Sequence, residues 1–170
     1  MSWFNLSQYL GTWYELAHYP SWFQRNDNYN TKAEYALNAD GSVSVHNSTI
    51  SQGKPFDSYG TAKTLGGLNF RVDFPIPEVA KLAQSGQFQQ PDASDFIMQG
   101  PNYVIDRIWT NECGQYIFAV VTDPSRQSLY VLSRYCHPSL IAYNEVMAYV
   151  VANFDRDRLV QTPHFGEKGY

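Results

Sequence analysis

Hydrophobic and polar residues alternate with a period of two over most of the chain, which is typical of strands with one buried face. Short stretches rich in Gly, Pro, Asn and Asp separate these segments, as expected for turns. The pattern predicts eight strands, at Thr12–Tyr19, Thr31–Ala39, Ser42–Ser51, Phe56–Leu65, Leu68–Phe74, Asn102–Thr110, Gln115–Thr122 and Gln127–Tyr135.

The connections between these strands predict their order. Asp40-Gly41 and Gly66-Gly67 suit two-residue hairpins that require positive φ, and Asp123–Ser125 suits a slightly longer turn. Hairpins that follow one another along the chain give an antiparallel, up-and-down sheet. The predicted fold class is therefore all-β, with the eight strands closed into a barrel.

A different period follows the last of these strands. After Pro138-Ser139, apolar residues recur at helical spacing and predict one α-helix packed outside the barrel, over about residues 138–154. A short final strand is expected at about 159–162, before Pro163. A chain of 170 residues is the size of one domain, so residues 1–170 are interpreted as a single unit with the barrel at about 12–135.

Composition and charge argue against several classes of function. Hydrophobic residues make up 44% and aromatic residues 16%, a balance that favours pleated, half-buried surfaces. The net charge is −4 and the 12 Lys and Arg residues are scattered, so we expect no nucleic-acid partner. The longest apolar run, Tyr116–Val121, is far too short for a membrane-spanning helix. The first residues contain no basic and apolar leader, so a native start at Met1 predicts a cytoplasmic protein.

The barrel interior is the expected place of function. Eight strands leave room inside either for packed side chains or for one small ligand. Small and large apolar residues are mixed at the positions predicted to face inward, as a cavity wall requires. The candidate ligand-binding residues are Ala17, Tyr19, Tyr35, Leu37, Val45, Phe70, Val72, Ala119, Val121, Tyr130 and Leu132.

Two motifs near the ends of the predicted barrel resemble those of a known family. Residues Tyr9–Ala17 read Tyr-Leu-Gly-Thr-Trp-Tyr-Glu-Leu-Ala, and Thr122–Arg134 contains Thr-Asp-Pro-Ser-Arg and Leu-Tyr-Val-Leu-Ser-Arg. Together they resemble the signatures of the lipocalins, closest to the bacterial lipocalin and apolipoprotein D branch. The turn Thr110–Tyr116 departs from the Thr-Asp-Tyr of many lipocalins, so receptor contacts at that turn are not carried over.

The resemblance implies a carrier of a small hydrophobic ligand, such as a fatty acid or lysophospholipid, that needs no cofactor and catalyses no reaction. The first and last strands of a closed barrel are neighbours, so Trp13 and Arg134 should meet at one end and form a cation–π contact. Gly11 lets the chain turn in close beneath them. We therefore predict a barrel floor made of Gly11, Trp13 and Arg134.

The two cysteines are both predicted at the closed end of the barrel. If the last hairpin turns at Asp123–Arg126, Cys113 and Cys136 face each other across the final strand pair and a disulfide is within reach. Two reduced thiols are the alternative, as in cytosolic proteins. Neither cysteine lies inside the predicted cavity, so neither is expected to act as a nucleophile.

Other polar residues give little support to catalysis or metal binding. His18, His46, His137 and His164 fall on different elements, without metal-ligand spacing, so no metal site is expected. His18 has outward parity and is interpreted as a surface residue. Glu15 is predicted to point into the barrel, where a hydrogen-bonded structural role is favoured over contact with a ligand head group or catalysis.

Two loops are predicted at the open end. The segment Pro75–Phe96, with a helical turn or two at Glu78–Ala83, and the loop Pro20–Asn30 could form a lid, or the former could be an unstructured insertion. An alternative function is a filled barrel that binds a protein partner through these loops, with Trp22 and Phe23 as exposed apolar residues. The same two residues would fit transient contact with a membrane surface.

Overall fold

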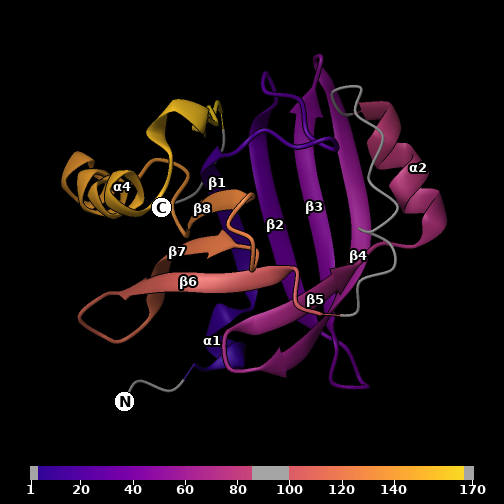
Figure 1. Cartoon of the computed structure of the whole chain (residues 1–170), viewed down its shortest axis with the longest axis horizontal. Helices are drawn as coiled ribbons and strands as arrows, with labels where there is room; N and C mark the ends of the chain where they lie inside the picture. Colours follow the sequence, from indigo (N-terminus) through magenta and orange to yellow (C-terminus); the bar gives the residue numbers. More distant parts are fainter. Residues whose placement is uncertain (1–3, 86–99, 167–170) are drawn as a thin grey trace.

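The fold is a closed antiparallel barrel, described here by a computed structural model over residues 4–85 and 100–166. In this part of the chain nine strands form one sheet with the order β2-β3-β4-β5-β6-β7-β8-β1-β9, and β1 also pairs with β2 to close it (Figure 1). The strands are β1 Gly11–His18, β2 Tyr29–Leu37, β3 Val43–Ser51, β4 Lys54–Gly66, β5 Asn69–Asp73, β6 Tyr103–Thr110, β7 Tyr116–Thr122, β8 Leu129–Ser133 and β9 Val160–Gln161. The predicted eight-stranded, up-and-down barrel with a short final strand is confirmed.

The predicted turns explain the up-and-down order. Gly41, Gly66 and Gly67 have positive φ values of 87°, 106° and 59°, which glycine adopts without steric cost. The turn between β7 and β8 is longer than predicted because β8 begins only at Leu129. The Asp123 carboxylate accepts hydrogen bonds from the backbone N–H groups of Ser125 and Ser128 and so holds this turn.

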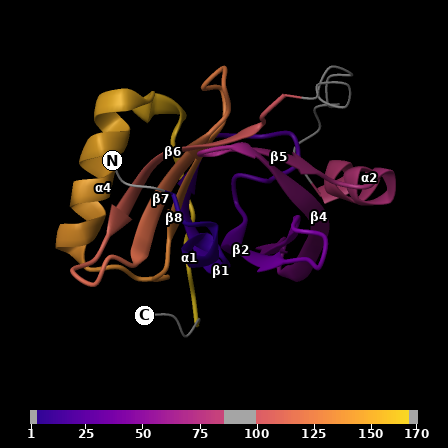
Figure 2. The same cartoon turned by 90° about the horizontal axis from the view of Figure 1, so that it is seen from below.

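Helices lie around the barrel and not inside it. The predicted C-terminal helix is confirmed as α4, Leu140–Asn153, and packs on the outside of the sheet, on the opposite side from α2, Ile76–Ser85 (Figures 1 and 2). A four-residue helix that the sequence pattern did not predict, α1 Leu6–Tyr9, lies at the closed end, where Asn5 caps it. A 3-10 turn, η1 Arg156–Arg158, leads from α4 into β9. No described helix is long and apolar enough to cross a membrane.

The strand β1 is irregular, and this irregularity allows the C-terminal segment, residues 160–166, to pair with the sheet. β1 pairs with β2 only from Gly11 to Tyr14, and a bulge between Glu15 and Ala17 then shifts its register against β8. The edge of β1 that β2 leaves is taken by β9, which pairs with Ala17 and His18. Asn30 at the start of β2 bonds in turn to the backbone of Phe165 through its side chain, so the C-terminal segment bridges the split.

Apolar side chains form one layer on each face of the sheet, an outer layer and an inner layer. The outer layer lies under α4 and includes Val146 and Val150 of the helix against Phe118 and Val131 of the sheet. The inner layer fills the lower barrel around Trp13. Successive side chains along β7 and β8 point alternately into the outer and the inner layer. Both faces of these two strands are therefore buried, which explains why both are apolar.

Candidate ligand-binding site in the barrel

The barrel floor has the predicted cation–π contact. The guanidinium carbon of Arg134 lies 3.9 Å from the centre of the Trp13 ring, and Trp13 is fully buried. Arg134 also donates hydrogen bonds from Nη1 to the carbonyl of Thr12 at 2.7 Å and from Nη2 to those of Gln8 and Leu10 at 2.7 and 2.8 Å. The floor residue thus joins the last strand to the first strand and to α1.

Gly11 takes its predicted place in the floor for a clear steric reason. Its φ of 98° is a conformation that other residues rarely adopt, and a Cβ at this position would lie 3.4 Å from Nη1 of Arg134. Any other residue would strain the backbone here, and its Cβ would be in contact with the guanidinium. The three predicted floor residues, Gly11, Trp13 and Arg134, therefore act as one unit.

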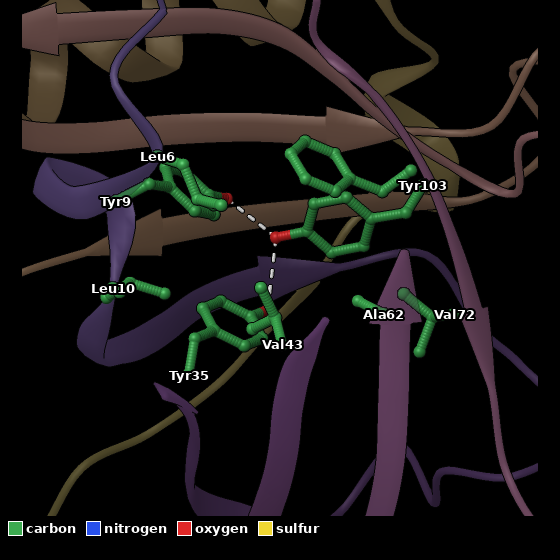
Figure 3. Close-up of a pocket in the computed structure, with 9 residues that line it drawn as sticks. Leu6, Tyr9, Leu10, Tyr35, Val43, Ala62, Val72 and Tyr103 are labelled. Carbon is green, nitrogen blue, oxygen red and sulfur yellow. Dashed lines mark hydrogen bonds between the residues drawn. The ribbon is translucent and has the colours of Figure 1, made fainter. Parts of the chain in front are cut away.

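Three tyrosine hydroxyls meet in the lower barrel. The hydroxyl oxygen of Tyr103 lies 2.6 Å from that of Tyr9 and 3.0 Å from that of Tyr35 (Figure 3). Burial raises the pKa of Tyr35 to about 12 and raises the pKa values of Tyr9 and Tyr103 well above the ordinary value. All three phenols are therefore neutral at physiological pH. We call these three residues the tyrosine cluster.

A small cavity adjoins the tyrosine cluster. Its volume is about 20 Å³, which is enough for roughly one water-sized group and not for a hydrocarbon chain. Helix α1, β2–β5 and the start of β6 surround it, with Leu6, Tyr9, Leu10, Tyr35, Val43, Ala62, Phe70, Val72 and Tyr103 as its lining (Figure 3). The closed end of the barrel is thus well packed.

The wall becomes more accessible toward the open end. On β3, Val43 and Val45 are buried, whereas Asn47 and Thr49, which face the same way, are half-buried. Across the barrel, Tyr130 faces inward and is also only partly buried. Along β3, the inward-facing side chains are therefore less buried toward the mouth than toward the closed end.

Most of the predicted wall residues face the interior. Phe70, Ala119, Val121 and Leu132 belong to the inner apolar layer, with Tyr35 and Tyr130 packed against it. Val45 forms a neighbouring inner cluster with Val43 and Ala62, and Val72 packs against that cluster. Their role as ligand contacts remains a prediction.

Three predicted wall residues lie elsewhere. Ala17 and Tyr19 belong to the outer layer under α4 because the bulge in β1 adds one residue and so reverses the side-chain alternation beyond it. Leu37 is 58% exposed because it ends β2 at the closed rim, beyond the packed interior. These three predictions are wrong as to position.

The bulge also overturns the surface assignment of His18. His18 pairs with Tyr130 across β1 and β8 and is only 1% exposed, because its side chain follows the inward direction that the bulge creates. Its Nδ1 lies 2.8 Å from the carbonyl oxygen of Tyr19. A one-residue irregularity therefore moves a histidine from the expected surface into the protein.

Glu15 is buried and hydrogen-bonded, as predicted. Its Oε2 accepts a hydrogen bond from the amide of Gln24 at 2.9 Å and another from the hydroxyl of Thr162 at 2.6 Å. These partners come from the β1–β2 loop and from the C-terminal segment, so the carboxylate ties both to β1. Together with burial, the charge of Glu15 raises the pKa of Tyr130.

No disulfide joins the two cysteines. The observed pairing of β7 with β8 matches Phe118 with Ser133, a register two residues away from the one that would bring the cysteines together. Cys113 lies exposed in the turn before β7, whereas Cys136 is buried. The register is displaced because the β7–β8 turn extends to Ser128. The possible disulfide is therefore not formed.

The two predicted mouth loops differ in how far the structure describes them. Trp22 and Phe23 are half-buried and pack edge to face with ring centres 5.4 Å apart, so they are less exposed than expected. The predicted helical turns at Glu78–Ala83 are part of α2, where the Glu78 carboxylate accepts a hydrogen bond from the backbone N–H of Tyr59 on the outside of β4. Residues 86–96 of the predicted lid lie outside the described residues.

The four histidines do not come together at a metal site. His46 is held on the outer face of the barrel between the carboxylates of Glu34 and Asp57, at 3.1 and 2.8 Å. The rings of His137 and His164 lie 6.4 Å apart near the C-terminal segment. Among the described residues no group of three or more His, Cys, Asp or Glu side chains is placed to hold a metal ion.

Comparison with known proteins decides the family. The model of the lipocalin-like domain family matches residues 4–164, which is nearly the whole chain. The chain is a lipocalin. It is 32% identical over 160 residues to temperature-induced lipocalin-1 of Arabidopsis thaliana, covering 94% of this chain and 78% of the relative. It is 33% identical over 132 residues to the outer membrane lipoprotein Blc of Citrobacter freundii, covering 77% of this chain and 62% of the relative.

Solved structures agree with this fold. The major allergen Per a 4 from cockroaches superposes with a TM-score of 0.60, covers 97% of this lipocalin and 92% of its own chain, and is 16% identical. That level of identity supports the fold and nothing finer. The lipocalin family binds small hydrophobic molecules, and the homologues of this chain are binding or transport proteins and not enzymes, so this chain is assigned to the binding proteins.

Sequence reasoning missed two members of the site. Tyr9 precedes the first predicted strand, and the local pattern gave no sign that α1 turns its ring into the barrel. Tyr103 lies in a predicted strand, and its alternation with Ile105, another interior residue, could have placed it inside. The meeting of their hydroxyls depends on closure of the barrel, because Tyr9, Tyr35 and Tyr103 come from distant parts of the chain.

Proposed function

We propose that this lipocalin binds and carries a single-chain lipid, such as a fatty acid or a lysophospholipid, in the upper part of its barrel. The observation that supports this proposal most directly is the change of the inward-facing wall from buried at Val45 to partly accessible at Thr49 and Tyr130. The wall combines apolar residues with tyrosine hydroxyls, so it offers contact area for a hydrocarbon chain and hydrogen bonds for a polar end.

The hydrophobic effect supplies enough free energy for such a role. Burial of about ten methylene groups at ~0.8 kcal/mol each contributes ~8 kcal/mol before the costs of association. Those costs are at least ~4 kcal/mol, which leaves an affinity in the millimolar to micromolar range before polar contacts are added. No reaction at the ligand is needed for a carrier.

The proposal is tested by titration of the delipidated protein with a fluorescent fatty acid, together with a plug in the wall. Tyr130→Trp enlarges an inward-facing side chain, and Tyr59→Trp is its control because Tyr59 lies 52% exposed on the outer face of β4. We expect saturable one-to-one binding that Tyr130→Trp weakens at least about tenfold and Tyr59→Trp leaves unchanged, since only the first change fills the cavity.

The opposite outcome would favour a second function. The closed end is already well packed, with a cavity of only about 20 Å³, as in a barrel that holds no ligand. Absence of fatty-acid binding, or binding that is indifferent to Tyr130→Trp, would point to a protein partner that contacts the mouth loops near Trp22 and Phe23.

A further inference from the structure

We propose that the tyrosine cluster binds the carboxylate of a single-chain lipid, so that the acid group lies toward the barrel floor and the hydrocarbon tail toward the mouth. This inference rests on the proposed function and adds to it the chemical class of the head group and the direction of entry. It is carried by three features: the hydrogen-bond donors of the cluster, the charge of Arg134 and the position of Glu15.

The tyrosine cluster has one more donor than it uses. Tyr9, Tyr35 and Tyr103 carry three hydroxyl protons, and two hydrogen bonds join them. One proton is therefore left over among the described residues, and rotation of the C–O–H groups can turn the other two toward the same acceptor. A carboxylate is the lipid head group best suited to accept hydrogen bonds from several converging hydroxyls.

The charge of Arg134 favours an anion at this place. Arg134 forms no ion pair with a carboxylate among the described residues, and its half-buried guanidinium donates hydrogen bonds to backbone carbonyls and stacks on the Trp13 ring. The ring of Tyr9 packs against the ring of Trp13, and the two ring centres lie 5.0 Å apart. The positive charge and one member of the tyrosine cluster therefore contact the same Trp13 ring at the floor.

Glu15 disfavours the reverse orientation. It lies on β1 two positions nearer the mouth than Trp13, it is 3% exposed, and its charge acts on the inward-facing Tyr130. A lipid carboxylate in the upper barrel would share that space with a like charge of low solvent exposure, which is unfavourable. The interior thus presents donors at the floor and an acceptor higher up.

The experiment compares two lipids of equal chain length in calorimetric titrations. Dodecanoate carries an acceptor head group, and dodecylammonium carries donors only. Tyr103→Phe removes the hydroxyl that both others contact and keeps the ring, so we expect dodecanoate to bind at least about tenfold more weakly and dodecylammonium to bind as before. A merely structural effect of Tyr103→Phe would weaken both lipids alike.

A matched control uses a tyrosine outside the barrel. Tyr149→Phe removes a hydrogen bond of 2.6 Å to Asp106 beneath α4 and should leave both affinities unchanged. If Tyr103→Phe does not fold, as judged by thermal unfolding, Tyr35→Phe serves in its place because it removes one of the three donors and leaves Tyr103 bound to Tyr9. We expect it to weaken dodecanoate binding about threefold or more.

The outcomes separate this inference from the proposed function. Dodecanoate binding that is weakened by loss of the cluster hydroxyls alone supports both. Dodecanoate binding that is unchanged in Tyr103→Phe and Tyr35→Phe overturns the inference and leaves the carrier function in place. Failure of the wild-type protein to bind dodecanoate or the fluorescent fatty acid overturns the carrier function, and the inference falls with it.

Discussion

Arg134 and Trp13 come from opposite ends of the barrel sequence, and the guanidinium carbon of the first lies 3.9 Å from the ring centre of the second. Closure of the sheet makes this contact possible because β8 and β1 are hydrogen-bonded neighbours. The same arginine donates hydrogen bonds to the carbonyls of Gln8 and Leu10, at the C-terminal end of α1. The contact therefore couples strand closure to the helix that seals the floor.

Replacement of Arg134 by methionine should destabilise the protein by about 2–4 kcal/mol, because four backbone carbonyls lose their donor and the Trp13 ring loses its cation. Urea unfolding measures the difference. Arg107→Met is the control: Arg107 also stacks on aromatic rings, at 5.1 Å from Trp109 and 5.0 Å from Tyr149, but it is exposed. We expect a loss of about 1 kcal/mol or less there, and equal losses would contradict the role of the floor.

The pair Ala17 and Ala119 tests the reversal of side-chain direction in β1. Both alanines are fully buried, but Ala17 packs under α4 and Ala119 faces the interior. Leucine at either position should cost about 1–3 kcal/mol of stability through overpacking. Only Ala119→Leu should also weaken binding of a fluorescent fatty acid, and an equal loss of affinity in Ala17→Leu would show that the bulge does not redirect β1.

Stability should fall in alkali because of the tyrosine cluster. Burial raises the pKa of Tyr35 to about 12 in the folded protein, whereas the unfolded chain has the ordinary value near 10. The folded state then retains protons that the unfolded state has lost, so the stabilising contribution is complete below about pH 10 and is lost as the pH rises toward 12. Each such tyrosine adds a slope of up to about 1.4 kcal/mol per pH unit.

Unfolding in urea at about pH 8 and about pH 11 measures this effect, and Tyr35→Phe is the matched variant because it removes one titrating group and keeps the ring. We expect the variant to lose less stability over this interval than the wild type. A wild-type free energy of unfolding that stays constant up to about pH 11 would mean that these hydroxyls are not buried in solution.

Thr162 and Glu15 link the C-terminal segment to β1, with 2.6 Å between the Thr162 hydroxyl and the carboxylate. Thr162→Val should destabilise the protein by about 1–3 kcal/mol, because it leaves a buried carboxylate with one hydrogen bond fewer. In a background that already carries Glu15→Gln the same change should cost clearly less, since the pair is coupled. Additive losses in a double-mutant cycle would argue against the contact.

The two cysteines should differ in reactivity. Cys113 is exposed in the turn before β7, and Cys136 is 3% exposed. A thiol reagent such as Ellman's reagent should modify Cys113 at once in the native protein and Cys136 only after unfolding. Cys113→Ser should abolish the fast phase and leave the slow one. Recovery of no reactive thiol after unfolding without a reductant would contradict the absence of a disulfide.

Local sequence patterns were sufficient to predict the side-chain directions in strands that alternate strictly, without a bulge. The strands, the glycine turns and the helix α4 follow from period and turn chemistry, and Phe70 and Leu132 face inward as predicted. Gly11, Trp13 and Arg134 could be matched because they lie in motifs near the two ends of the barrel. In these cases a short stretch of sequence specifies the local structure almost alone.

Apart from Leu37, which lies beyond the packed interior, the misplaced residues share one cause. The bulge in β1 and the extended β7–β8 turn shift the register by one or two residues, and such shifts have no strong signal in the local sequence. The bulge explains why Ala17, Tyr19 and His18 face the side opposite to the predicted one. The extended turn explains why the two cysteines do not pair. Strand period is exact, so a single extra residue reverses every side chain that follows it.

The sequence by itself determined the class of fold, the family and the composition of the barrel wall, because alternation, turns and two motifs are local properties. Only the tertiary structure decided which hydroxyls meet at the floor and which carboxylate the C-terminal segment holds. Tyr9 and Tyr103, like Glu15 and Thr162, are far apart in the chain. Their contact depends on barrel closure and strand register, which are set by the packing of the whole sheet and not by any one segment of it.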